Sequence, residues 1–147
     1  MMAITDKINE LAHDVLMDMG FDFDVLEPSG YPLEESVTAS IAIDGVWRGI
    51  LALSIPARFA RTFSARWLGI EEDDVSEHVA LDSFGELMNT MGGHFKARFC
   101  GKGELGLPVV IEDRAECEAP KGAEEALVAH FICEGFPIRF SVSVRAS

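Results

Sequence analysis

The segment VSEHVALDSFGELMNTMGGHFKARFC, from Val75 to Cys100, decides how the rest of the chain is organised. Its apolar residues recur at about 100° per residue and fall on one stripe, which predicts an amphipathic helix with one buried side. Residues 74–77, with the sequence DVSE, are typical of a capping box at the start of a helix. The apolar stripe consists of Ala80, Phe84, Leu87, Met88, Met91, Phe95 and Phe99.

The opposite side of this helix is polar and contains a gap. At positions i, i+4, i+7 and i+11 it carries Asp82, Glu86, Asn89 and Gly93. Each glycine inside a helix costs about 1 kcal/mol relative to alanine, and a helix accepts that cost when something must approach its backbone. A solvated face whose two glycines admit a neighbouring helix explains the same pattern. The pattern alone leaves both explanations open.

The rest of the chain predicts two further helices. Apolar residues at helical spacing indicate one helix over residues 4–19 and a shorter one over 56–69. A glycine ends each helix, and Pro56 suits the first turn of the shorter one. That shorter helix is expected to bury Phe59, Phe63 and either Trp67 or Leu68.

Strands are predicted where apolar residues recur at every second position. One hairpin is expected over residues 37–55 with its turn at Asp44-Gly45, and a second over 127–144 with its turn at 134–137. Residues 107–112 are expected to form a buried strand.

The polar spacing resembles that of a known family. Asp82-x3-Glu86-x2-Asn89-x3-Gly93, followed by Pro108 ahead of an apolar run, is similar to the motif of the CheC/CheX/FliY phosphatases of bacterial chemotaxis. The isolated motif and the length of 147 residues resemble the CheX form in particular. The proline lies closer to Asn89 than in the CheC form.

The resemblance implies a pseudo-symmetric α/β (α+β) fold. A mixed or antiparallel sheet of about six strands would carry two long helices on one face and a third, shorter helix. The order helix, extended segment and hairpin occurs in residues 4–55 and again in 75–145, joined by the helix over 56–69. The chain is therefore expected to be one domain, residues 1–147, with an internal duplication.

The polar motif itself is only weakly repeated in the first half of the chain. The corresponding residues of the first helix are Asp6, Glu10, His13 and Met17. Because histidine and methionine stand in the places of asparagine and glycine, we expect the first half to be catalytically silent.

A carboxamide beside a carboxylate suits hydrolysis of an acyl phosphate. A carboxamide both accepts and donates hydrogen bonds, so it can fix a water molecule without being a strong base. Phosphoryl transfer needs little more, because its transition state is loose and positioning dominates. The resemblance supplies the substrate, the phosphorylated aspartate of a CheY-like response-regulator receiver domain.

The resemblance also implies a role for each polar residue. Asn89 would orient the attacking water and Glu86 would engage the receiver's active-site lysine, while Asp82 and the thin helix at Gly93 would fit the receiver's cleft. The Mg²⁺ would belong to the receiver, leaving this chain with no metal or cofactor of its own. The partner-binding set is completed by Ser83 and Thr90.

Two other functions remain open. One is a catalytically silent adaptor of the same fold that binds a receiver or a flagellar-switch partner. The other is a small interaction domain outside chemotaxis. The intact pair Glu86 and Asn89 with Gly93 favours the phosphatase. Metal binding is disfavoured because the four histidines lack metal-ligand spacing.

The amino-acid composition limits which binding partners and which cellular compartment are expected. A net charge of −13 argues against binding nucleic acid and against an anionic membrane surface. We expect a cytoplasmic protein, because Cys100, Cys117 and Cys133 are odd in number and widely spaced and because no signal peptide or spanning segment is evident. A homodimer is also expected, through a sheet edge such as 138–144.

Overall fold

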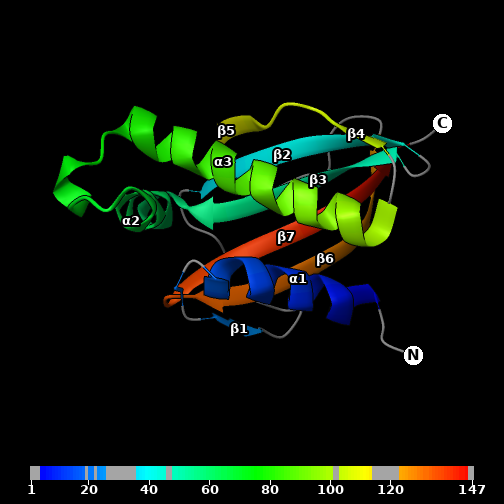
Figure 1. The fold of residues 1–147 in the computed structure, drawn as a ribbon, viewed down its shortest axis with the longest axis horizontal. Helices are drawn as coiled ribbons and strands as arrows, with labels where there is room; N and C mark the ends of the chain where they lie inside the picture. Colours follow the sequence, from blue (N-terminus) through cyan, green and yellow to red (C-terminus); the bar gives the residue numbers. More distant parts are fainter. Residues whose placement is uncertain are drawn as a thin grey trace.

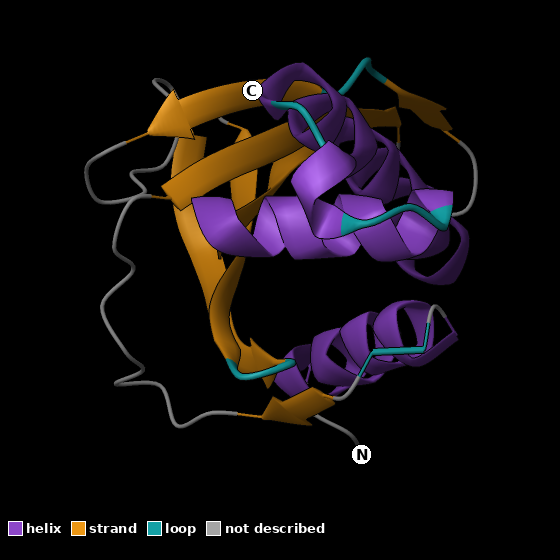
Figure 2. Ribbon diagram, turned by 90° about the vertical axis from the view of Figure 1, so that its left-hand side faces the viewer, coloured by secondary structure: helices purple, strands orange, loops and turns teal. Residues whose placement is uncertain are grey.

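The computed structural model describes residues 4–18, 20–21, 23–25, 36–45, 48–100, 103–113 and 123–145. In this part of the chain, three α-helices lie on one face of a single sheet, and Figure 2 shows that face from the side. Helices α1 (Ile4–Asp18) and α3 (Glu77–Phe95) are the long ones, and α2 (Ala57–Leu68) is shorter (Figure 1). The predicted α+β architecture is confirmed.

All strand pairs in the sheet are antiparallel, and its order is β1-β6-β7-β3-β2-β4, with β5 also paired to β2. The two hairpins form the middle of the sheet and meet where β3 pairs with β7. The strands are β1 (Phe23–Val25), β2 (Ser36–Gly45), β3 (Arg48–Pro56), β4 (Gly103–Leu105), β5 (Val109–Asp113), β6 (Ala123–Cys133) and β7 (Phe136–Arg145).

Both predicted hairpins are present. In the first, Asp44 pairs with Arg48, and residues 46–47 of its turn lie outside the described part of the chain. The second has a two-residue turn, Glu134-Gly135, with both φ angles positive, as in a type I′ turn. The expected turn at 134–137 was too long, because Phe136 and Pro137 already pair with β6.

Two expectations about strand exposure were wrong. Strand β7 pairs on both sides, so it is an interior strand and not a sheet edge. Strand β5 was expected to be buried, but it pairs only with β2 and is an edge strand. Its first residue, Val109, is 53% exposed, and Leu107, two residues earlier, is 86% exposed.

Helix α2 begins after Pro56, which is its N-cap, and ends at Gly69 in the left-handed conformation. Phe59 and Phe63 are buried as predicted and both pack against the ring of Phe21. Trp67 and Leu68, one of which was expected to be buried, are both about half-exposed. Both lie in the last turn of α2, where the Trp67 ring still contacts Phe63, with ring centroids 5.5 Å apart.

Helix α3 starts two residues later than a capping box at Asp74 requires. Its N-cap is Ser76, whose hydroxyl accepts a hydrogen bond from the Val79 amide, while Asp74 ends a preceding 3₁₀ turn. The α-helix ends at Phe95, and residues 96–100 continue as a π-helical turn. The predicted apolar stripe is buried from Ala80 to Phe95 and packs over β2 and β3.

Candidate active site

The outer face of α3 presents the predicted polar residues to solvent. Asp82, Glu86 and Asn89 are exposed, and Gly93 is partly exposed in line with them. The other side of the same helix is held by fully buried residues such as Phe84, Leu87 and Met91. The polar stripe is therefore a fixed, outward-facing feature of the fold, because rotating the helix would expose its apolar side.

The two adjacent glycines of α3 have different surroundings. A Cβ placed on Gly92 would lie 3.1 Å from Ile41 Cγ2 and 3.4 Å from Leu105 Cδ2, so this glycine lets the helix lie close to β2 and β4. A Cβ on Gly93 would meet nothing within 4 Å. Close packing, against strands instead of the expected helix, therefore explains Gly92. It does not explain Gly93, which leaves a notch on the polar face.

Ser83 and Thr90 differ from the exposed stripe. Ser83 is only 5% exposed, which leaves it little surface to offer a partner. Thr90 is partly exposed, and its hydroxyl donates to the backbone carbonyl of Glu86, 3.0 Å away. That bond holds the Thr90 side chain against the turn that carries Glu86.

The corresponding residues of α1 lie on a separate helix. Glu10 and His13 are exposed, and Met17 is 45% exposed where α3 has its notch. The side chain of Asp6 lies outside the described part of the structure. A bulky side chain therefore stands at the position that is open on α3.

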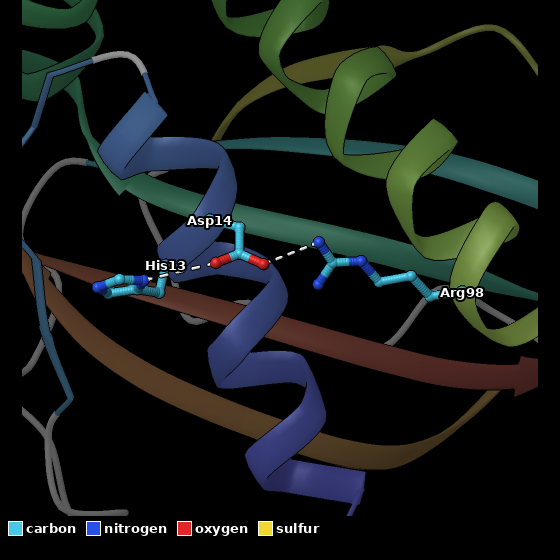
Figure 3. Close-up of polar contacts among 3 residues, drawn as sticks. All are labelled: His13, Asp14 and Arg98. Carbon is cyan, nitrogen blue, oxygen red and sulfur yellow. Dashed lines mark hydrogen bonds and ion pairs between the residues drawn. The ribbon is translucent and has the colours of Figure 1, made fainter.

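An ion pair joins the end of α3 to α1 (Figure 3). Arg98, in the π-helical turn, places Nη2 2.8 Å from Asp14 Oδ2, and His13 Nδ1 lies 3.7 Å from Asp14 Oδ1. The hydrogen bond from Arg98 is the main cause that lowers the pKa of Asp14 from its usual 3.8. His13 therefore lies beside the carboxylate of Asp14, its neighbour in the chain. Asn89, at the corresponding position of α3, is an exposed and uncharged residue.

The described surface has hollows elsewhere, around α2. Two of them share Thr62 and Glu72 in their lining and extend to Arg66 on one side and Phe136 on the other. Neither is lined by the polar stripe of α3. Among the described residues, no group of three His, Cys, Asp or Glu side chains could hold a metal ion.

No helix within the described ranges is both long enough and apolar enough to cross a lipid bilayer.

The comparisons with known proteins agree with this fold. The family model described as "Chemotaxis phosphatase CheX" matches residues 37–131, which include the whole polar stripe of α3. This is well over half of the chain, so the chain belongs to the CheX chemotaxis phosphatase family. No curated protein matched the chain.

Solved CheX structures share the fold at low sequence identity. The CheX chain of the CheX-CheY-BeF₃-Mg²⁺ complex from Borrelia burgdorferi is 18% identical, with a TM-score of 0.75 over 96% of this chain and 97% of that one. CheX from Vibrio vulnificus is 15% identical, with a TM-score of 0.76 over 96% of each chain. CheX from Desulfovibrio desulfuricans is 17% identical, with a TM-score of 0.76 over 97% of this chain and 100% of that one.

The two glycines of α3 should respond oppositely to the same substitution. Gly92→Leu forces a large side chain against Ile41 and Leu105 and should lower the free energy of unfolding by roughly 1–3 kcal/mol, the usual cost of overpacking. Gly93→Leu meets open space and exchanges glycine for a strong helix former, so it should be neutral or stabilising by up to about 1 kcal/mol. Urea unfolding measures both. Equal destabilisation by the two variants would contradict the open notch.

The ion pair at Asp14 should make a small, pH-dependent contribution to stability. Because the folded pKa of Asp14 is lowered, its stabilising effect is present above the unfolded pKa of about 3.9. The effect is lost as pH falls through the folded value. Asp14→Asn should therefore be less stable than the wild type at pH 7, by roughly 0.2–1 kcal/mol for an exposed pair, with the difference vanishing in strong acid. A difference that grows below pH 3 by thermal unfolding contradicts this sign.

Proposed function

We propose that this chain hydrolyses the phosphoaspartate of a CheY-like receiver domain, using the outer face of α3. The observation that carries the proposal is the exposed pair Glu86 and Asn89, one turn apart beside the open backbone at Gly93. Membership of the CheX phosphatase family supports the reaction. The Borrelia burgdorferi relative, whose structure contains CheY, BeF₃ and Mg²⁺, supports the partner class.

The exposed stripe suits a reaction that takes place inside the partner. Asn89 stands out from a helix that is anchored along its other side, so the helix can enter a cleft as a rigid unit. Its carboxamide accepts a hydrogen bond from a water molecule and aligns that water with the phosphorus atom. The water oxygen bonds to phosphorus, the phosphorus–oxygen bond to the aspartate breaks, and the receiver carboxylate leaves with the electron pair. The water's proton passes to the phosphate or to solvent.

The carboxylates on the stripe are assigned to docking. Glu86 faces outward one turn before Asn89 and pairs with the lysine of the receiver's active site, while Asp82 contacts the edge of the cleft. Thr90 keeps the Glu86 turn in place through its hydrogen bond to the backbone. The Mg²⁺ is supplied by the receiver, and a receiver partner places the reaction in the cytoplasm.

Assembly as a homodimer is the second part of the proposal. The β4–β5 side is an open edge of the described sheet, and it carries the exposed side chains of Leu107 and Val109. Exposed apolar edges are usually paired or guarded. The same edge of a second copy of this chain is equally apolar and can pair with it. The duplication of residues 4–55 and 75–145 remains a prediction.

Substitutions on α3 should separate catalysis from docking. Asn89→Ala should still bind the phosphorylated receiver but lose roughly 10²-fold or more in dephosphorylation rate, the scale of losing one positioning contact. Asn89→Asp should fail too, because a carboxylate repels the phosphoryl group. Glu86→Ala should lose both binding and rate, with an effect that depends on salt.

The matched controls are Glu10→Ala and His13→Ala on α1, which should leave turnover nearly unchanged. The measurement is phosphate release from a phosphorylated receiver, with binding to a beryllofluoride-loaded receiver followed in parallel. Full activity of Asn89→Ala excludes the mechanism. Binding without any turnover by the wild-type chain identifies an adaptor, and loss of activity in a folded His13→Ala variant moves the site to α1.

The dimer should depend on the β4–β5 edge. Light scattering of the wild-type chain at tens of micromolar should give the mass of two chains, and Val109→Lys should give the mass of one, because a charge on an edge strand opposes pairing. Ala57→Lys, an exposed position at the start of α2, serves as the control and should stay dimeric. A monomeric wild type contradicts the proposal.

A further inference from the structure

One cation continues the polar stripe of α3 beyond the notch. Lys96 follows Asn89 by seven residues and Gly93 by three. Its amide donates to the carbonyls of Gly92 and Gly93, and its backbone is still α-helical. Helical geometry therefore holds up to this residue. It places Lys96 about 20° around the axis from Asn89 and about 10 Å further along it.

The notch gives the Lys96 side chain room in the direction of Asn89. In an α-helix each Cα–Cβ bond tilts toward the N-terminus, so a long side chain covers the turn that precedes its own Cα. For Lys96 that turn contains Gly93, which has no side chain and open space around it. A Lys96 side chain extended in that direction would bring its ammonium over the gap between Gly93 and Asn89.

Lys96 is partly exposed, so its charge is within reach of a partner. It is the only lysine or arginine on a stripe that also carries Asp82 and Glu86, in a chain of net charge −13. Within the described residues, no carboxylate lies within ion-pair distance of its ammonium. Nearby Arg98 is already paired with Asp14. A favourable position near the helix C-terminus accounts for a cation in this turn, but not for its place in line with Asn89.

We propose that the Lys96 ammonium contacts the phosphoryl oxygens of the phosphoaspartate that Asn89 addresses. This inference rests on the proposed phosphatase function and adds a residue to the same site. Two carboxylates approaching a phosphoryl dianion repel it, and an ammonium on the same face offsets that repulsion through charge-assisted hydrogen bonds. Lys96 transfers no proton and forms no bond. Its contact makes the chain prefer the phosphorylated receiver over the unphosphorylated one.

The test compares affinities of full-length variants for one receiver, with and without beryllofluoride in the presence of Mg²⁺, together with the dephosphorylation rate. Lys96→Gln should reduce the preference for the loaded receiver about 10- to 100-fold, the range for a hydrogen bond to a charged group. The loss in kcat/KM should appear mainly in KM. Lys96→Arg keeps the charge and should retain most of the preference.

Arg61→Gln is the matched control. It makes the same charge change at an exposed residue of α2 and should leave the preference unchanged, with circular dichroism confirming the fold of each variant. An unchanged preference in Lys96→Gln overturns the proposal. An equal loss of affinity for the loaded and the unloaded receiver also overturns it. The same holds if Arg61→Gln reduces the preference as much as Lys96→Gln does. A wild-type chain that binds the loaded receiver without hydrolysing phosphoaspartate refutes the phosphatase function instead, and the affinity ratio still decides the role of Lys96.

Discussion

Burial of the apolar stripe of α3 is the interaction on which the rest of the molecule depends. Phe84, Leu87, Met88 and Met91 are completely buried where α3 packs against the sheet and the other helices, and burying each such side chain contributes roughly 1.5–3 kcal/mol. This anchoring fixes the rotation of the helix about its axis. Because the inner side cannot leave the core, Glu86, Asn89 and the Gly93 notch have to face outward. The polar stripe thus owes its orientation to the core beneath it.

Local patterns in the sequence were enough to predict this helix and most of the sheet. The apolar stripe repeats every 3.6 residues and the hairpin strands every two residues, and both periods mark the residues that become buried. The helix and the hairpins of the structure therefore match these patterns. The same periodicity placed Asp82, Glu86 and Asn89 together on one exposed face. It could not separate Gly92 from Gly93, because that difference lies in what each glycine meets: Ile41 and Leu105 for one, open space for the other.

Features set by distant parts of the chain were not predictable in this way. Arg98 and Asp14 are 84 residues apart, and no local signal pairs them. The order of strands put β7 inside the sheet and left β5 at an edge, although both are apolar. Trp67 and Leu68 fit the stripe of α2, but they lie in its last turn and are about half-exposed, although the Trp67 ring contacts the buried Phe63. In each case the decisive fact is which element lies next to which, and that follows from tertiary packing.

We propose that the outer face of α3 is the surface that meets the phosphorylated partner. The most direct measurement is the change in backbone-amide NMR shifts when a receiver carrying beryllofluoride and Mg²⁺ is added. We expect the largest changes along residues 82–96, with the amides around Asn89 and Gly93 among them. Changes centred on Glu10 and His13 of α1, with α3 unaffected, would contradict it.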